Sequence, residues 1–458
     1  MKHIQKFSIS FLFPLFLAVS LLTASAFGSV IFATPSNYLS FLATLHPGDT
    51  LLLAQGNYYG LPIYNINGTP TNPIIITGPD TDPLPVILGS SGASTVRLDN
   101  SSYVTIRNLE VNCRNLGGDG VNSQGITHHI TLENLYIHGF SDEQGTVGIS
   151  TNRAPVWNWI IRNNVITDGG TGMYLGNSDG NEPFIAGIIE NNIIYDTIGY
   201  NIEIKQQNPR PTDIPGIPTA DNVTIIRNNV FGKANNTSTG DMSRPNLLVG
   251  HWPLSGAGMN DVYEIYGNFF YQNPTGEPLF QGEGNIALYN NLFFNSVGEG
   301  IWIQPHYDVP RTIRIFNNTV VARDSGIKVT GGSTLYQQRV IGNAIYSSNP
   351  IQASDRSDNI TDSYQNASLY LSNPFGNLGQ KDFFPKAGKL KGGPINTSSF
   401  NTYHDWNRDF NFNLHNGIFR GAYAGEGQNP GWLPKLERKP MFSSDNTPPA
   451  PRTHFRIE

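Results

Sequence analysis

The chain has 458 residues, of which 38% are hydrophobic and only 14% are charged, with 48 Gly and 31 Pro. Asn occurs 50 times, about 11% of the chain, although Asn is a poor residue for helix interiors. This composition disfavours a helical bundle, a coiled coil and an acidic disordered protein. With 29 Lys and Arg against 35 Asp and Glu, the chain has no basic surplus for a phosphate backbone, so nucleic acid is not an expected partner.

Residues 1–26 have the pattern of a secretory signal peptide. Lys2 and Lys6 precede an apolar run from Phe11 to Leu22, and small residues then lead to Ala26. The run is too short to span a bilayer, and no later stretch reaches that length. We therefore expect cleavage near Ala26 and a secreted protein, extracellular or periplasmic, without a membrane span; an uncleaved membrane anchor is the alternative. Cleavage removes two Lys and no acid, which changes the net charge from −6 to −8.

A unit made of an apolar stretch, an Asn and a second apolar stretch recurs along the chain, with spacings of 23 to 39 residues. A minimum period in the low twenties with variable insertions is typical of a solenoid. Alternating apolar residues and β-branched side chains make each coil a set of short strands. The sequence therefore predicts an all-β, right-handed parallel β-helix, in which the Asn side chains form a ladder between coils. The recurring residues are Asn108, Asn134, Asn164, Asn192, Asn229, Asn268, Asn291, Asn318 and Asn343.

The periodicity divides the mature chain into three parts. We expect an N-terminal cap with the first coils over 27–95, regular coils over 96–375, and a C-terminal cap with a Pro-rich tail over 376–458. The open ends of a solenoid need such caps. Because both ends would be covered, we expect a monomer.

The second strand of each coil can be aligned row by row, with an apolar residue facing the core in every row. Side chains at alternate positions then face outward. The first outward column reads Asn122, Ser150, Tyr174, Glu203, Leu248, Phe280, Trp302 and Lys328. The second reads Gln124, Asn152, Gly176, Lys205, Gly250, Gly282, Gln304 and Thr330, and just beyond it come Arg153, Asn177, Gln206, His251, Trp252, Glu283 and His306.

Rows about 4.8 Å apart bring these charges, amides and aromatic rings within about 10 to 15 Å of each other. Aromatic faces stack on sugar rings while amides and charges bind hydroxyls. We therefore interpret the column as a groove for an extended polysaccharide, with Arg153, Asn152, Asn177, Gln206, Trp252, Phe280, Glu283, Trp302, Gln304 and His306 as binding residues. A polar outer face without function is the alternative.

Glu203-Ile204-Lys205 lies at the centre of this column. Residues two apart on a strand face the same side, so both charged groups enter the groove. A cation beside Lys205, such as calcium or Arg153, would lower the pKa of its amine towards that of a general base. An ordinary surface ion pair is the alternative.

The chain resembles the alginate lyase and chondroitinase B group, polysaccharide lyase family 6. The resemblance lies in Pro47-Gly48-Asp49-Thr50, Gly56-Asn57-Tyr58, Gly68-Thr69, Asn72 to Ile76 and the Glu-x-Lys strand. It implies that Glu203 is a ligand of Ca²⁺ and that Lys205 removes the C5 proton of a uronate. An Arg in the family's next coil assists as acid. Here Arg244 precedes the strand and His251 follows it, so the proton donor is either of these or Tyr174.

The leading hypothesis is a polysaccharide lyase that cleaves an acidic, uronate-containing polysaccharide by β-elimination. A second is a glycoside hydrolase that uses Glu203 with Glu283, or Asp179 as another acid. A third is a non-catalytic glycan-binding or surface structural protein, which would need the aromatic residues but not Lys205.

Two further features are given no functional role. Cys113 is the single cysteine, so no intrachain disulfide is possible, and we expect it to be a small buried apolar residue. His128 and His129 begin a strand, where neighbouring side chains face opposite sides, so we do not expect them to share a metal.

Overall fold

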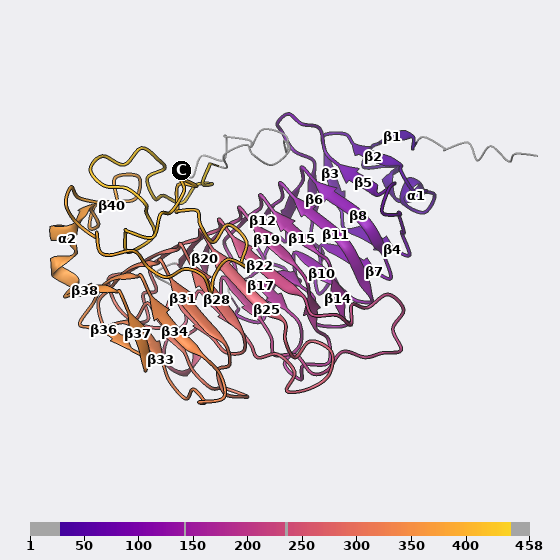
Figure 1. The fold of residues 1–458 in the computed structure, drawn as a ribbon. Coiled ribbons are helices and arrows are strands. Elements are labelled where there is room, and N and C mark those ends of the chain that lie inside the picture. The colour runs from indigo at the N-terminus through magenta and orange to yellow at the C-terminus, as the bar shows by residue number, and fades with distance from the viewer. Residues whose placement is uncertain (1–27, 142, 234–236, 441–458) are drawn as a thin grey trace, which may run out of the picture.

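The computed structural model describes residues 28–141, 143–233 and 237–440. Three long parallel sheets enclose a common core, and the coils progress from α1 (Tyr38–Leu42) at one end to β38 (Ile360–Asp362) at the other (Figure 1). We number the sheets 1, 2 and 3 in the order in which each coil passes through them. The predicted right-handed parallel β-helix is confirmed. The predicted signal peptide and residues 441–458 of the tail lie outside the described residues.

The strands of each sheet follow one another in chain order. Sheet 1 contains β1 (Val30–Ala33), β2 (Thr50–Leu53), β5 (Ile74–Thr77), β8 (Ser102–Arg107), β11 (Thr127–Glu133), β15 (Ile160–Arg162), β19 (Ile188–Glu190), β22 (Val223–Arg227), β25 (Val262–Tyr266), β28 (Ile286–Tyr289), β31 (Ile313–Phe316), β34 (Gln338–Ile341) and β37 (Asp355–Ser357), with β14 (Val156–Trp157) and β18 (Phe184–Ile185) beside them. Sheet 2 contains β3 (Asn57–Tyr59), β6 (Val86–Leu88), β9 (Glu110–Asn112), β12 (Tyr136–His138), β16 (Val165–Ile166), β20 (Ile193–Thr197), β23 (Val230–Lys233), β26 (Phe269–Tyr271), β29 (Leu292–Asn295), β32 (Thr319–Ala322), β35 (Ala344–Tyr346) and β38. Sheet 3 contains β4 (Leu61–Tyr64), β7 (Val96–Asp99), β10 (Val121–Ser123), β13 (Val147–Ser150), β17 (Thr171–Leu175), β21 (Ile202–Ile204), β24 (Leu247–Val249), β27 (Phe280–Gly282), β30 (Ile301–Ile303), β33 (Ser325–Val329) and β36 (Asn349–Gln352).

Little of the described chain is helical. Besides α1 there is α2 (Ala367–Tyr370), and the turns η1 (Gly240–Met242) and η2 (Tyr364–Asn366) are 3₁₀ helices. After α2, β39 (Leu371–Asn373) and β40 (Asp382–Pro385) form an antiparallel pair. None of the helices in the described residues is long and apolar enough to cross a membrane.

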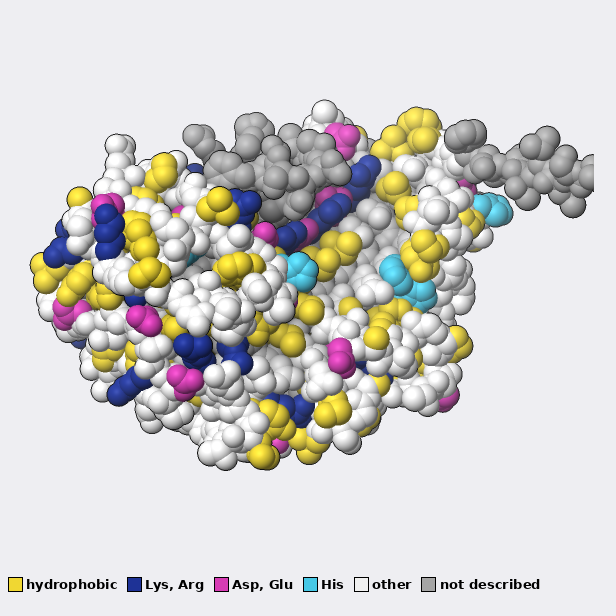
Figure 2. Space-filling view, viewed as in Figure 1, with side chains coloured by type: hydrophobic (Ala, Val, Ile, Leu, Met, Phe, Trp, Pro, Cys, Tyr) yellow, Lys and Arg dark blue, Asp and Glu magenta, His cyan; other side chains and the backbone are white. Residues whose placement is uncertain are grey.

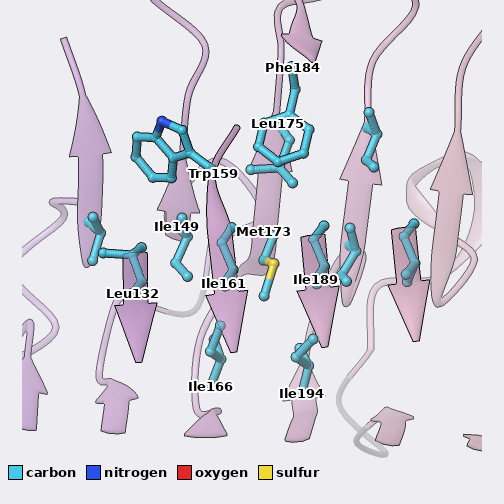
Figure 3. Packing of buried hydrophobic residues seen from close by; sticks show 14 of the residues in the cluster. Leu132, Ile149, Trp159, Ile161, Ile166, Met173, Leu175, Phe184, Ile189 and Ile194 are labelled. Atoms are coloured by element: carbon cyan, nitrogen blue, oxygen red, sulfur yellow. The ribbon is translucent and has the colours of Figure 1, made fainter. Parts of the chain in front are cut away.

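The interior is a stack of apolar side chains that repeat from coil to coil (Figure 3). Leu132, Ile161 and Ile189 occupy one row of sheet 1 in adjacent coils, and all three are fully buried. Ile149 and Met173 face them from sheet 3. Because each apolar side chain packs on its equivalent above and below, the alternation seen in the sequence becomes a continuous core. Cys113 belongs to this core, as expected.

An Asn ladder joins successive coils at the corner between sheets 1 and 2. The Asn192 amide donates to Asn229 Oδ1 at 3.0 Å, and its nitrogen also bonds Ile161 O at 2.9 Å. The same pattern continues without a break from Asn164 to Asn359. The predicted ladder is therefore confirmed from Asn164 onward.

In the first two coils the Asn side chains also pair between coils, the Asn134 amide donating to Asn108 Oδ1 at 3.3 Å, but they do so one position before the column of the later ladder. Asn108 and Asn134 have φ angles of 57° and 52°, and they share this left-handed conformation with the residue just before the ladder in later coils, such as Asn163 at 58°. Leu109 and Leu135 occupy the ladder position instead and are fully buried. Asn serves both positions, because it tolerates positive φ and can also pair through its amide, so spacing alone does not separate them.

A second ladder runs along the outer edge of sheet 1. Arg107, Glu133, Arg162, Glu190 and Arg227 are partners in adjacent strands, so opposite charges alternate. A stripe of basic and acidic side chains crosses this face of the molecule (Figure 2). In later coils aromatic residues replace the charges. Tyr289 and Phe316 stack with ring centroids 4.7 Å apart.

The C-terminal segment runs back along the corner between sheets 1 and 2 (Figure 1). Phe400 stacks on Phe316 with a centroid distance of 4.0 Å, and Ala422 N donates to Thr319 Oγ1 at 2.9 Å. Near the end, the fully buried Lys439 ammonium lies 3.2 Å from Asn228 Oδ1. The segment therefore covers the side of the solenoid as well as its end.

We predict that Asn229→Ala destabilises the protein by about 3 kcal/mol or more, because the substitution leaves several buried polar groups of neighbouring coils unpaired at about 1–3 kcal/mol each. Those groups are the backbone N–H and the side-chain amide of Asn192, which both donate to Asn229 Oδ1, and the carbonyl of Ile189, which accepts from Asn229 Nδ2. Chemical denaturation measures the change. The matched control is Asn401→Ala at an exposed position, and an equal loss in both variants would contradict the role of the ladder.

Candidate functional site

The predicted outward column is present on sheet 3, with a correction in one row. Register pairs Tyr174 with Glu203 and Glu203 with Leu248, as expected. Leu248 then pairs with Gln281, which pairs with Trp302. Phe280 is fully buried, so its prediction as a binding residue is wrong, and Gln281 takes the outward place. Leu279 and Phe280 are both apolar and both buried, so the pattern alone could not decide which of them begins the row.

A cleft of about 460 Å³ lies on this outer face across β21, β24, β27 and β30. We call it the sheet 3 cleft. Eight of the predicted residues line it: Glu203, Lys205, Gln206, Arg244, Glu283, Trp302, Gln304 and His306. Leu248, Gly250 and Gly282 of the predicted outward columns line it as well. Residues that sequence reasoning missed complete it: Tyr200, Ser243, Pro245, Val249, Glu277, Gln281 and Tyr307.

A buried ion pair forms part of the cleft. Lys205 Nζ lies 2.7 Å from Glu203 Oε1, and only 14% and 5% of the two side chains are exposed. Burial lowers the pKa of Lys205, but the charge and hydrogen bond of Glu203 more than offset this, so the pKa lies above the ordinary lysine value. Burial raises the pKa of Glu203, although Lys205 opposes the shift. The side chain of Lys205 therefore keeps its proton at neutral pH.

This result reverses the lowered pKa that we expected for Lys205. The expectation needed a cation beside the amine, and the nearest partner is instead a carboxylate. Arg153, proposed as that cation, does not line the cleft. A raised pKa suits a cation or a proton donor better than a base.

Arg244 reaches the cleft from the long turn between β23 and β24. Its guanidinium donates to Ser243 O at 2.7 Å and to Asp241 O at 2.9 Å. Its own carbonyl accepts bonds from Lys233 Nζ at 2.6 Å and Asn273 Nδ2 at 2.9 Å. These two bonds attach the turn to the solenoid and so fix the position of the Arg244 guanidinium in the cleft.

Glu283 holds a wall of the cleft in place. Its Oε2 accepts the backbone N–H groups of His306, Tyr307 and Asp308 at 2.9, 3.1 and 3.4 Å. Glu283 is 3% exposed. The carboxylate therefore positions the turn that carries His306 and Tyr307, which is a use that a residue pattern does not reveal.

Two other proton-donor candidates flank the cleft without lining it. The Tyr174 ring centroid lies 5.6 Å from Lys205 Nζ, and its hydroxyl is 2.7 Å from Ser178 Oγ. His251 Nδ1 lies 2.8 Å from Trp252 O, and its ring is 5.8 Å from that of Tyr307. Tyr174 therefore lies beside Lys205, and His251 lies beside Tyr307 in the wall of the cleft.

Several predicted binding residues lie elsewhere. Trp252 is fully buried and stacks on Tyr263 with a centroid distance of 4.1 Å, so its prediction as a binding residue is wrong; an apolar ring just past a strand folds under the loop that follows. Asn152 and Asn177 bond each other, from Asn177 Nδ2 to Asn152 O at 3.0 Å. These two and Arg153 belong to earlier coils, outside the cleft.

The residues around Glu203 do not make a calcium site of the usual kind. Calcium takes six to eight oxygen ligands, several of them carboxylates. Within residues 28–141, 143–233 and 237–440, no group of three or more His, Cys, Asp or Glu is placed to hold a metal, and the Glu203 carboxylate already pairs with an ammonium. Calcium at Glu203 stays a prediction, and no chemical step below depends on it.

No protein-family model matches the chain, and no curated protein matches it in sequence. Among solved structures, it is similar to a GH136 lacto-N-biosidase from Eubacterium ramulus, at 13% identity and a TM-score of 0.44 over 73% of this chain and 68% of that one. It is similar to a PL6 family polysaccharide lyase from Pseudopedobacter saltans, at 16% and 0.43 over 73% and 91%. It is also similar to an alginate lyase from Paenibacillus, at 17% and 0.40 over 73% and 98%. A PL6 enzyme is thus among the structures that the chain resembles, but similarity at this level assigns neither a reaction nor a substrate.

We predict that Lys233 makes stability rise with pH. Burial lowers its pKa to about 7, whereas an unfolded lysine has a pKa of about 10.4. Between these values the unfolded chain binds more protons than the folded one, so the free energy of unfolding contributed by this residue rises as pH rises. In Lys233→Met this rise is lost.

Denaturation of both proteins from pH 7 to 10 measures the difference. The buried Lys439, whose pKa burial also lowers to about 7, is common to both proteins and cancels. The control is Lys389→Met at an exposed position, which should follow the wild type. A Lys233→Met protein with the wild-type pH dependence would show that the ammonium is not desolvated.

Proposed function

We propose that the protein is a polysaccharide lyase that cleaves a uronate-containing polysaccharide by β-elimination in the sheet 3 cleft. One observation carries the proposal: a lysine held in its protonated form by a buried carboxylate, in a polar cleft that an arginine also lines. Elimination needs a positive charge at the uronate carboxylate, a base for the C5 proton and an acid for the departing O4. The cleft offers a group for each task.

The roles follow from charge and position. Arg244, with the amide of Gln281, neutralises the uronate carboxylate, which acidifies the C5–H bond. His306 lines the cleft and is the base, because a neutral imidazole has a nitrogen that can accept a proton. The electron pair of the C5–H bond forms the C4=C5 double bond, and the C4–O4 bond breaks. Lys205 donates its proton to O4, and Glu203 stabilises the charged form of Lys205 between turnovers. Tyr174 and His251 remain further candidates for the donor.

An extended polymer suits the shape of this face. Trp302 and Gln304 continue the cleft on the next coil, and a half-buried indole beside amides is a common surface for a sugar ring. The net charge of the chain is negative, so attraction to a polyanion must come locally from Arg244 and Lys205. Degradation of a polymer agrees with the predicted export through residues 1–26, and a monomer stays our expectation.

A specific observation favours a hydrolase as the second candidate. Glu203 and Glu277 line the same cleft, and burial raises the pKa of both. A carboxyl group with a raised pKa can act as the general acid of a glycosidase. Glu277 is a better partner than Glu283, which was suggested by the sequence, because Glu283 is engaged by three backbone N–H groups.

We predict that the protein produces unsaturated uronate ends from at least one member of a panel of uronate polysaccharides, and that Lys205→Ala lowers the rate at least 100-fold, in line with the contribution of a general acid. Ultraviolet absorbance of the unsaturated product follows the reaction, with calcium or a chelator in parallel samples. Lys389→Ala is the control, because Lys389 is exposed and does not line the cleft.

Other outcomes of that assay separate the alternatives. Reducing ends without absorbance would reject elimination and favour Glu203 with Glu277 as hydrolytic residues. Binding of the polymers with neither signal would favour a glycan-binding protein. Activity lost only in chelator would bring the calcium prediction back.

The pH profile distinguishes the two possible roles of Lys205. Its pKa lies above the ordinary lysine value, so as a cation or acid it is active throughout the neutral range, and on the alkaline side kcat should fall only when pH passes that raised pKa. As a base it would act only in its rare neutral form, and kcat would climb tenfold per pH unit up to the same point. We expect the first profile, and a continuous climb from pH 7 to 10 would contradict it.

A further inference from the structure

One acidic residue of the sheet 3 cleft has no partner of its own. Glu277 lies in the turn between β26 and β27 and lines the cleft, where its side chain is half-buried. Among the described residues, none donates a hydrogen bond to its carboxylate or forms an ion pair with it. A partly desolvated carboxylate is costly unless water or a ligand supplies its hydrogen bonds. Glu277 is therefore available for contact with a bound sugar.

The backbone of the turn fixes the position of Glu277. Asn273 Oδ1 accepts hydrogen bonds from the N–H and the hydroxyl of Thr275 at 3.2 and 2.7 Å. The fully buried Asn295 amide donates to Glu277 O at 3.3 Å and to Glu299 O at 3.0 Å, which joins this turn to the turn of the next coil. The carboxylate is thus brought to the cleft by its backbone and not by a side-chain partner.

The next coil shows the kind of partner that Glu277 lacks. Glu299 lies in the corresponding turn, before β30, and its carboxylate pairs with Lys328 Nζ at 2.9 Å. One coil earlier, the residue in register with Lys328 is Trp302. An indole stands there in place of an ammonium, so the ion pair of one coil is not repeated in the other.

Two cations near Glu277 bind backbone carbonyl groups instead. Burial raises the pKa of Glu277, and the charges of Lys233 and Arg244 oppose this shift, so both cations lie near the carboxylate. Lys233 Nζ donates to Arg244 O at 2.6 Å, and the Arg244 guanidinium donates to carbonyl groups of its own turn. The cleft therefore presents a guanidinium and a carboxylate that form no ion pair with each other.

These two groups suit opposite edges of one sugar ring. A uronate carries its carboxylate on C5 and hydroxyl groups on C2 and C3, so one edge is an anion and the other donates hydrogen bonds. Arg244 suits the first edge, and the Glu277 carboxylate accepts charge-assisted hydrogen bonds from the second. A sulfate ester in place of a hydroxyl removes the donor and brings a negative charge against Glu277, and repulsion of this kind sets specificity.

We propose that Glu277 selects sugars whose hydroxyl groups are free, by accepting hydrogen bonds from those groups and by repelling a sulfated sugar. The inference rests on the proposed function and narrows its substrate to uronate polysaccharides without a sulfate ester on the bound sugar. Glu277 is then a specificity-determining residue, and no step of the elimination is assigned to it.

Binding of matched polymers tests this selection. Polygalacturonate, polymannuronate and hyaluronan are each compared with a chemically sulfated sample of the same polymer by calorimetry in about 0.15 M salt, where charges beyond roughly 8 Å are screened. We expect the wild type to bind at least one unsulfated polymer about tenfold or more tightly than its sulfated form. Glu277→Gln keeps the size of the side chain and removes its charge, so this preference should fall about fivefold or more.

Glu437→Gln is the matched control, because it removes the same charge from the chain. The Glu437 side chain is 61% exposed, and the residue does not line the cleft. This variant should keep the wild-type preference.

Two results would overturn the proposal. Equal affinity of the wild type for both forms of every polymer that it binds is one, and it needs no variant, so misfolding cannot hide it. The other is a folded Glu277→Gln protein with the wild-type preference. Ultraviolet absorbance in the same samples separates this inference from the proposed function: the preference without unsaturated product supports the role of Glu277 and rejects elimination, whereas elimination without the preference does the reverse. Binding to none of the polymers rejects both.

Discussion

The hydrogen bonds that keep successive coils in register are the constraint on which this molecule depends. The backbone pairs along three parallel sheets, and the buried Asn amides from Asn164 to Asn359 tie each coil to the next at one corner. A slip of one residue in any coil would orphan these amides and would also reverse the faces of the strand. The ladder therefore fixes the register of each coil relative to both of its neighbours.

Register converts distance along the chain into proximity on a surface. Tyr174, Glu203, Leu248, Gln281 and Trp302 are spread over more than a hundred residues, yet they are direct neighbours on sheet 3. The turns between strands can differ in length, because they lie outside the sheets and the Asn ladder and a longer turn does not change the register of the strands. Long turns bring Arg244 and His306 to the same place, and buried contacts from Lys233 and Glu283 hold those turns at their bases.

The cleft and a bent column that carries two histidines lie on different sheets. Sheet 3 carries the cleft with the Lys205–Glu203 pair. Sheet 1 carries the alternating ion ladder at one edge and the bent column, in which His129 and its equivalents in adjacent coils have φ angles of 53° to 56° and His128 Nδ1 lies 2.9 Å from His129 Nδ1. The C-terminal segment, as far as residue 440, covers the corner between sheets 1 and 2 and contributes no residue to the lining of the cleft. A solenoid can keep two such surfaces independent, because each coil contacts mainly its neighbours.

The sequence alone determined the architecture and the centre of the cleft. Alternation with period two is a local property of each strand, so the core-facing positions and the shared side of Glu203 and Lys205 could be derived without coordinates.

Tertiary structure decided what depends on turns and bends. It separated the two Asn columns, replaced Phe280 by Gln281, buried Trp252 and brought Glu277 and Tyr307 to the cleft. It also brought His128 and His129 together, because one left-handed residue cancels the alternation on which the contrary expectation rested. The tertiary structure also decided the raised pKa of Lys205, because that pKa depends on burial and on the distance to a carboxylate, and a residue pattern contains neither.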